Sequence, residues 1–484
     1  MPTKILLTHN GALRTKYGSA GLRRIRAAAR AAVAADKARG VQTRWISLDD
    51  ARSARSLHVD KVAPDDAAAT KAFVDALYAK SRPDYLVLLG SVDVVPMQAL
   101  RNPLYSPDPR RGDPDRTTPS DLPYACDAAY SLDPGSFRGA TRVVGRLPDS
   151  TGGDDPATLE QRLAAAASYA SSDRATYLPP FALTAADWHG STSQTLARVV
   201  GSSDALTDVP PGGPPWPTGT TRRLLHFFNC HGGAADWRFY GQHAQSYPLA
   251  LDATTIVQEQ RVVAAAECCY GALLYDPAEA GGRHGFADAY LDAGAYGFVG
   301  ATNVAYGPAN GNDGADLVCR FFLQHVLEGC SLGRALLQAR QDYVLQKTAL
   351  SPVDLKTLAQ FALYGDASIH AVAKAGPPGD DAAPPPGIDA RRRRLRANGD
   401  ALSATTTRAA ARPTELSGRE RERIAQQLGV SDVQTFDVVG SRRARPGPRE
   451  RFHVSMERDR AGLRVVVARE EDGRLYPPTV LRQR

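Results

Sequence analysis

Short, continuous apolar runs recur along the chain, each bounded by turn residues and separated by stretches with helical spacing. The runs lie at residues 5–7, 85–89, 142–144, 181–184, 224–228, 262–266 and 298–299. Runs of this kind are typical of strands that are buried on both faces, and residues 22–35 and 157–170 have the pattern of crossover helices. The sequence therefore predicts an α/β fold with a largely parallel sheet.

The pattern changes toward the end of the chain. Helical spacing at 317–326 and 332–345, followed by a short apolar run at 361–364, completes the α/β part. Residues 376–410 are rich in Pro, Gly and then Arg, a composition typical of a linker. We therefore divide the chain into α/β subdomains at 1–150 and 151–375, a linker at 376–410, and a further domain at 411–484.

The last of these domains is predicted to be a small α+β unit. Ser417 and Glu420 match a capping box that opens a helix ending near Leu428. Alternating apolar residues at 452–456 and 463–467 then indicate a β-hairpin. The helix also resembles the start of a helix-turn-helix, but strand-like residues follow where a recognition helix is expected.

Net charge and hydropathy limit which classes of protein this chain can belong to. The 484 residues carry a net charge of +7, and much of the excess lies in the arginines of 391–396 and 442–451. We attribute the basic character to a linker and tail and give nucleic-acid binding little weight. No stretch approaches the ~20 apolar residues of a membrane-spanning helix, and the first residues lack a signal-peptide pattern. We expect a soluble cytoplasmic protein.

The six cysteines indicate free thiols. They are scattered and form no repeated C-x-x-C pattern that could hold zinc, at positions Cys126, Cys230, Cys268, Cys269, Cys319 and Cys330. Reduced thiols in a reducing compartment fit this pattern best. We expect no metal and no cofactor.

Two blocks of sequence combine a buried strand with a reactive side chain. The first runs Leu-Leu-His-Phe-Phe-Asn-Cys-His-Gly-Gly and ends with His231 and Gly232; the second runs Val-Val-Ala-Ala-Ala-Glu-Cys-Cys-Tyr-Gly and contains Cys269 and Gly271. Reacting groups gather at the carboxyl ends of neighbouring strands in open α/β sheets. We therefore expect the imidazole and the thiol to meet across adjacent strand ends, in a cleft open to solvent. A thiolate can attack a carbonyl while the imidazole transfers the proton.

These blocks resemble the clan of cysteine peptidases that includes caspases, legumains, clostripain and gingipains. Within it the gingipain family is most similar, from about residue 85 to 366. The shared landmarks are the strand and turn at 85–96, Asp121-Leu122-Pro123-Tyr124, Val144-Gly145-Arg146-Leu147-Pro148, Trp237 after His231, and Leu363-Tyr364-Gly365-Asp366. The resemblance implies a caspase-like three-layer sandwich, with 151–375 as the catalytic subdomain.

Two registers are open for the nucleophile. The clan's Glu-(small)-Cys arrangement matches Glu267-Cys268-Cys269 and selects Cys269, with Cys268 where a small residue is usual. Family members with glycine three residues after the nucleophile would select Cys268. We favour Cys269, because side chains alternate faces along an extended chain and only one of the two can point into the cleft.

The resemblance also implies substrate-binding residues. In gingipains an acidic residue upstream of the histidine recognises a basic P1 side chain, and Asp187 takes that place here; the alternative is that Asp187 caps the helix beginning near Ser191. Tyr306 matches the aromatic wall of the specificity pocket, or is an ordinary loop tyrosine. No third catalytic carboxylate is assigned, since neither Glu267 nor Asp236 can be placed beside His231 from sequence.

We therefore predict an endopeptidase that acts on protein or peptide substrates with His231 and Cys269 as its dyad. The backbone N–H groups of Gly232 and Cys269 are the expected oxyanion hole. The absence of the gingipain leader pattern favours an intracellular enzyme regulated by proteolytic processing, and the arginines at 391–396 are the proposed cleavage site. The alternative function is a catalytically silent caspase-like scaffold that binds a protein partner.

Overall fold

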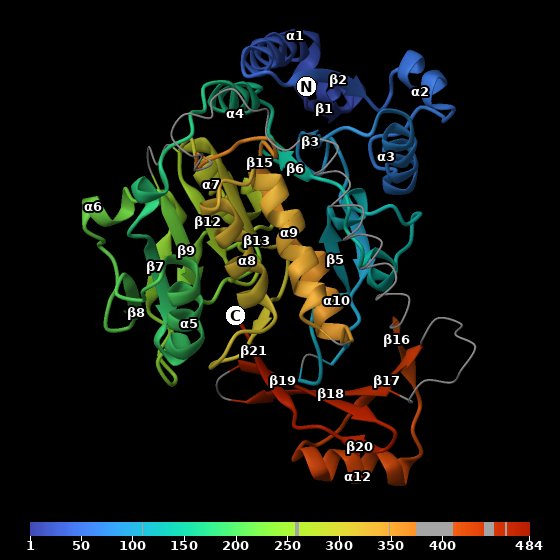
Figure 1. The fold of residues 1–484 in the computed structure, drawn as a ribbon, viewed down its shortest axis with the longest axis vertical. Helices are drawn as coiled ribbons and strands as arrows, with labels where there is room; N and C mark the ends of the chain where they lie inside the picture. Colours follow the sequence, from blue (N-terminus) through green and yellow to red (C-terminus); the bar gives the residue numbers. More distant parts are fainter. Residues whose placement is uncertain (109, 257–260, 348, 374–409, 440–449, 460–461) are drawn as a thin grey trace.

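A ten-stranded sheet forms the centre of the molecule (Figure 1). The computed structural model describes residues 1–108, 110–256, 261–347, 349–373, 410–439, 450–459 and 462–484. The strand order is β2-β1-β3-β6-β15-β13-β12-β9-β7-β8. In chain order these strands are β1 (Thr3–Thr8), β2 (Gln42–Ser47), β3 (Tyr85–Leu89), β6 (Val144–Leu147), β7 (Phe181–Ala185), β8 (Leu206–Val209), β9 (Leu225–Asn229), β12 (Val263–Ala266), β13 (Gly297–Ala301) and β15 (Phe361–Gly365). The predicted α/β fold with a largely parallel sheet is confirmed.

The sheet consists of two parallel halves that run in opposite directions. Every neighbouring pair is parallel except β13 and β15, which pair antiparallel with Val299 opposite Leu363. The carboxyl ends of β7, β9, β12 and β13 therefore share one edge of the sheet. The carboxyl ends of β1, β3, β6 and β15 share the opposite edge.

Helices cover both faces of the sheet. They are α1 (Asn10–Ala38), α2 (Ala51–Leu57), α3 (Ala67–Ser81), α4 (Ala157–Ala167), α5 (His189–Val200), α6 (Thr218–Thr221), α7 (Phe286–Asp292), α8 (Ala315–Leu327), α9 (Leu332–Leu345) and α10 (Pro352–Gln360). Along β12, Val263 and Ala265 face the core that contains α5, α8 and α9, while Ala264 and Ala266 face the core that contains α7. All four are fully buried, which is why this strand is apolar at every position.

Two small hairpins and a short strand flank the sheet. The hairpins pair β4 (Gln98–Arg101) with β5 (Thr117–Ser120), and β10 (Arg238–Tyr240) with β11 (Leu249–Asp252). The strand β14 (Tyr306–Gly307) follows β13. β10 lies shortly after the predicted catalytic residue His231, and β14 begins with Tyr306, a predicted substrate-binding residue.

The C-terminal part forms a second sheet with one helix beside it (Figure 1). Its elements are β16 (Ala410–Thr414), α12 (Gly418–Leu428), β17 (Gln434–Val439), β18 (Glu450–Asp459), β19 (Gly462–Glu471), β20 (Arg474–Leu475) and β21 (Thr479–Gln483). The Ser417 side chain accepts the N–H of Glu420 at the start of α12, and β18 pairs antiparallel with β19. The predicted helix and hairpin are thus confirmed.

The second sheet also includes a strand from the catalytic part. β21 pairs antiparallel with β14, so that Gln483 lies opposite Tyr306 and Arg482 opposite Gly307. The sheet order is β14-β21-β19-β18-β17-β16. The two parts of the molecule therefore share backbone hydrogen bonds, a connection that the sequence did not predict.

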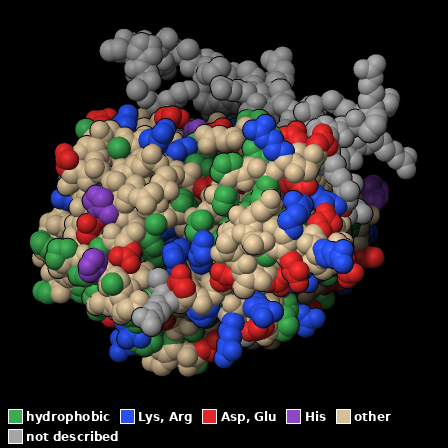
Figure 2. Space-filling model, turned by 90° about the horizontal axis from the view of Figure 1, so that it is seen from below, with side chains coloured by type: hydrophobic (Ala, Val, Ile, Leu, Met, Phe, Trp, Pro, Cys, Tyr) green, Lys and Arg blue, Asp and Glu red, His purple; other side chains and the backbone are tan. Residues whose placement is uncertain are grey.

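The remaining predictions on organisation concern the chain between these parts. The linker at 376–410 lies outside the described residues except for Ala410, which begins β16. On the face of the C-terminal part seen in Figure 2, basic and acidic side chains are interspersed. Within the described residues no helix combines the length and apolar character needed to cross a membrane.

Candidate active site

Two adjacent parallel strands position the predicted catalytic residues. β9 and β12 pair directly, with Phe228 opposite Ala266, and His231 and Cys269 follow the carboxyl ends of these strands. A Cβ on Gly232 would collide with the carbonyl oxygen of Cys269 and would lie 3.5 Å from the Cβ of Cys268. The turn that carries the histidine therefore packs directly against the turn that carries the thiols, and only a glycine permits this approach.

The two neighbouring thiols point to opposite faces. Cys268 belongs to the core on the α7 side, and its Sγ contacts the carbonyl of Phe228 at 3.8 Å. Cys269 belongs to the core on the α5 and α8 side, where its Sγ accepts the N–H of Ala305 at 3.2 Å. Burial raises the pKa of Cys268 well above the usual value, and the neighbouring Cys230 raises it further. The choice of Cys269 over Cys268 as the nucleophile depends on the two side chains pointing to opposite faces in this way.

The thiol of Cys269 is not exposed in this structure. Its exposed fraction is 0%, so the expected cleft open to solvent is wrong at the sulfur. Burial raises the pKa of Cys269 to about 12. The sulfur is therefore a protonated thiol at neutral pH, and a base must remove the proton when it reacts.

His231 is held as a neutral imidazole. Burial lowers its pKa to about 4, and the charge of Arg484 lowers it further. The Nε2 atom lies 2.8 Å from Oε1 of Gln242, whose own Nε2 donates to the carbonyl of Ala244 and to the Tyr247 hydroxyl. Since the amide oxygen of Gln242 can only accept, His231 carries its proton on Nε2 and has a free lone pair on Nδ1. The imidazole can therefore accept a proton through Nδ1.

Aromatic rings fix the plane of the imidazole. The Trp188 ring centroid lies 4.4 Å from that of His231, and the Tyr247 ring lies at 5.2 Å. Trp188 is buried at the start of α5. The sequence pattern pointed to Asp187 in this segment and not to the neighbouring Trp188.

Asp187 and Tyr306, the two predicted substrate-binding residues, lie on different sides of the site. Asp187 is exposed, accepts the N–H of Ala244 at 3.2 Å and lies 3.5 Å from Nδ1 of His243. Tyr306 is fully buried and donates to Asp113 at 2.8 Å. The side chain of Asp187 therefore faces the loop after β10, and the ring of Tyr306 lies in a buried cluster. Their roles in substrate binding stay predictions.

A buried acidic cluster lies beside the predicted site. Asp316, at the start of α8, forms an ion pair of 3.1 Å with Arg484, and both side chains have 0% exposure. Glu267 is buried next to Asp316, and burial together with the neighbouring carboxylate raises its pKa well above the usual value. Burial raises the pKa of Asp316 as well, while the Arg484 guanidinium opposes the shift. Glu267 thus belongs to this cluster. Asp236, the other carboxylate considered as a third catalytic group, pairs with Arg238 at 2.9 Å and accepts the Tyr240 hydroxyl at 3.0 Å.

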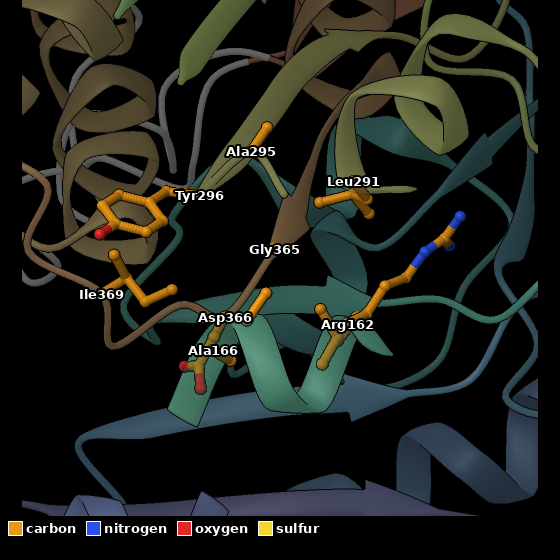
Figure 3. Close-up of a pocket in the computed structure, with 10 residues that line it drawn as sticks. Arg162, Ala166, Leu291, Ala295, Tyr296, Gly365, Asp366 and Ile369 are labelled. Atoms are coloured by element: carbon orange, nitrogen blue, oxygen red, sulfur yellow. The ribbon is translucent and has the colours of Figure 1, made fainter. Parts of the chain in front are cut away.

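The cavity shown in Figure 3 is remote from these residues. It lies at the opposite edge of the sheet, where Gly365 ends β15, Asp366 follows it, and Tyr296 precedes β13. The carboxylate of Asp366 accepts the Lys4 ammonium at 2.7 Å, so its charge is already paired. The cavity carries no side chain of the predicted dyad.

The pairing of β9 with β12 brings a histidine and a cysteine to adjacent strand ends of an α/β sheet. Residues 220–372 match the model of peptidase family C25, the gingipain family, and this stretch contains His231 and Cys269. The match covers less than half of the chain and makes this part similar to a family of cysteine-type endopeptidases. The family predicted from the sequence motifs is confirmed.

Other comparisons find more distant likenesses. The separase–securin complex of Saccharomyces cerevisiae contains a chain that aligns with 48% of this one at 12% identity, with a TM-score of 0.26. The aligned part covers 14% of that chain. No curated protein matches the sequence.

Proposed function

We propose that the protein is an endopeptidase in which Cys269 attacks the scissile carbonyl and His231 transfers the proton. The observation that carries this proposal is the adjacency of β9 and β12 within the region that matches family C25. Cys269 rather than Cys268 is proposed because it points toward the face on which α5 and α8 lie.

The geometry supports a stepwise reaction. Nδ1 of His231 accepts the thiol proton as Sγ forms a bond to the carbonyl carbon, and the oxyanion forms near the N–H groups of Gly232 and Cys269. The imidazolium then donates its proton to the leaving amine, and a thioester remains on Cys269. Water, deprotonated by the same imidazole, hydrolyses the thioester and restores the thiol.

We propose that cleavage follows basic residues. Two groups of acidic side chains lie near the proposed dyad: Asp187, which follows β7 and contacts the loop after β10, and Asp316 at the start of α8 with Glu267 directly after β12. A buried carboxylate facing a guanidinium gives a charge-assisted hydrogen bond that a neutral side chain cannot make.

We propose further that the enzyme acts inside the cell and is regulated by processing in the linker at 376–410. None of the six cysteines forms a disulfide in the described residues, which is the state expected in a reducing compartment. The processing site at 391–396 lies outside the described residues.

A catalytically silent scaffold is the second candidate function. The fully buried thiol of Cys269 favours it, because a nucleophile must reach its substrate. The two functions differ in whether the thiol can be brought to react with a peptide.

A P1-scanning fluorogenic peptide library on the full chain tests the proposal. We expect release after Arg or Lys, a loss of ~10³-fold or more in Cys269→Ala, and a much smaller effect in the matched control Cys268→Ala. Equal activity of Cys269→Ala and the wild type would assign the nucleophile elsewhere. If no variant cleaves a peptide and no thiol-reactive peptide probe labels Cys269, the scaffold is the correct function.

A further inference from the structure

The last strand of the chain ends beside the predicted dyad. β21 pairs with β14, and the N–H of Arg484 continues this pairing by donating to the carbonyl of Ala305 at 3.0 Å. The N–H of the same Ala305 donates to Sγ of Cys269. One backbone residue therefore links Arg484 to the proposed nucleophile.

The side chain of Arg484 fills a pocket built for a guanidinium. Its Nη2 donates to the carbonyl of Pro308 at 2.8 Å, to Asp316 at 3.1 Å and to the hydroxyl of Ser191 at 3.3 Å. The Trp188 ring lies below the guanidinium, with its centroid 4.4 Å from Cζ. A carboxylate, a carbonyl, a hydroxyl and an aromatic face together match the charge, the hydrogen-bond donors and the planar shape of this group.

A glycine leaves the room that the guanidinium occupies. A Cβ on Gly307 would lie 2.9 Å from Cζ of Arg484 and closer still to two of its nitrogens. Any side chain at this position of β14 would displace the guanidinium. The short strand β14 thus pairs with the backbone of β21 and also leaves the space for the Arg484 side chain.

The pocket is acidic and needs a cation. Asp316 and Glu267 are both fully buried, and two such carboxyl groups cannot both ionise without a compensating charge. Arg484 supplies that charge, and its charge lowers the pKa of both acids. An arginine side chain from another chain would supply the same charge and shape, and a lysine would supply the charge alone.

The pocket adjoins the catalytic imidazole. Trp188 contacts the Arg484 guanidinium and the His231 ring at the same centroid distance of 4.4 Å. A residue seated in this pocket therefore has its backbone beside Ala305 and Cys269 and its side chain separated from His231 by one indole. A residue in this pocket therefore lies next to both members of the proposed dyad.

We propose that β21 and Arg484 occupy the substrate-binding site as an internal substrate mimic. The mimic adds a strand to β14 and inserts a basic side chain between Trp188 and Asp316, the two modes by which an extended peptide is bound through its backbone and read through its side chain. The inference rests on the proposed function, of which it specifies the S1 pocket and the regulation. In this assignment Asp316, rather than the exposed Asp187, receives the P1 guanidinium.

The occupant is held by few bonds, which makes exchange with a substrate feasible. A guanidinium has five N–H donors. Among the described residues, Nε and Nη1 of Arg484 have no hydrogen-bond partner, so that only Nη2 makes such bonds. A peptide that pairs with β14 and places an arginine in the pocket competes with β21 for the same acceptors of Nη2.

Binding of an arginine analogue tests occupancy without requiring catalysis. The probe is N-acetyl-arginine methylamide, added to the full chain and followed by calorimetry and by Trp fluorescence. We expect binding at least ~10-fold tighter in Arg484→Ala than in the wild type, and loss of that gain in Arg484→Ala combined with Asp316→Asn. The matched control is Arg482→Ala, two residues earlier on β21, where the side chain pairs with Asp459 instead; it should behave as the wild type.

Peptide cleavage is the second measurement on the same variants. We expect kcat/KM for an Arg-P1 peptide to rise at least ~10-fold in Arg484→Ala and to stay unchanged in Arg482→Ala. Should Arg484→Ala not fold, Arg484→Lys keeps the charge without the planar fork and is expected to show a smaller rise of the same sign.

The two readouts separate the failure of this inference from the failure of the proposed function. Equal probe binding in wild type, Arg484→Ala and Arg484→Lys would overturn the internal mimic, whatever the peptidase activity. Tighter probe binding in Arg484→Ala without cleavage by any variant would retain the occupied pocket and overturn the peptidase. Cleavage at the same rate in all variants would retain the peptidase and overturn the mimic.

Discussion

At the scale of single residues, the state of His231 is set by groups that lie outside the motif. Burial keeps its pKa low, and Gln242 determines which nitrogen carries the proton. Gln242 is itself buried and held by the Ala244 carbonyl and the Tyr247 hydroxyl, so that its amide cannot turn freely. We regard it as a positioning residue for the imidazole.

Replacing Gln242 with Glu should raise the pKa of His231. A carboxylate 2.8 Å from Nε2 would favour the imidazolium, by ~1–3 pH units from the present value of about 4. The imidazole would then be charged over a wider acidic range, and the acidic limb of the pH–rate profile would move upward. Imidazole NMR measures the midpoint directly. Gln242→Leu is the control, since it removes the acceptor without adding charge; equal midpoints in both variants would contradict the assignment.

Sequence reasoning reached His231 and Cys269 because each follows a strand on the same local pattern. It missed Gln242, Asp316 and Arg484. The signal for Asp316 is weak, a lone acid in the first turn of an apolar helix, and Arg484 meets it across 168 positions of sequence. Contacts of that range depend on the docking of one sheet against another, which no local pattern encodes.

At the scale of elements, continuous apolar runs identified the covered strands and missed the two at the ends of the sheet. β2 has the burial of an edge strand, with exposed and buried residues alternating, and β8 is mostly half-buried. Neither needs apolar residues at every position, since no neighbour covers its outer side. The antiparallel pairing of β13 with β15 was also not predicted, because an apolar run does not show in which direction a strand runs.

A buried ion pair joins β6 to the loops at its end. Arg146 donates from Nε and Nη2 to Asp121, and from Nη1 to the carbonyls of Gly90 and Val95. Its exposed fraction is 0%. Replacing it leaves a buried carboxylate and several carbonyls without a partner.

Arg146→Met should lower the free energy of unfolding by about 3–5 kcal/mol, the range for breaking a buried pair on one side. Urea denaturation measures the change. The control is Arg421→Met, which removes an arginine that pairs with Asp432 at the surface, with half of its side chain exposed; it should cost less than about 1 kcal/mol. Similar losses in the two variants would show that burial does not decide the strength of these pairs.

At the scale of the whole molecule, the C-terminal sheet is attached at two places. One is the chain between residues 373 and 410, and the other is the pairing of β21 with β14 together with the buried ion pair of Arg484. Figure 1 shows the end of the chain close to α8 and far from β16. The second attachment does not depend on the first.

Cutting the chain within residues 376–409 should therefore not separate the two parts. With an engineered protease site in that segment, we expect both fragments to elute together on size exclusion and to retain the melting temperature of the intact chain within a few degrees. The same cut in Arg484→Ala should release the C-terminal fragment more readily. Elution of separate fragments from the otherwise unchanged protein would show that the pairing of β14 with β21 is too weak to hold them.

A short segment of chain tethers β21 to β19. This tether affects how an incoming peptide competes with β21 for the pocket. A group tethered near its site acts at an effective concentration on the order of millimolar, and the apparent affinity of a competitor falls by the fraction of molecules in which the site is vacant. Dilute peptides would rarely enter, whereas abundant or tightly binding ones would. Arg484 thereby sets a threshold concentration, above which an arginine of a substrate peptide displaces Arg484 from the pocket.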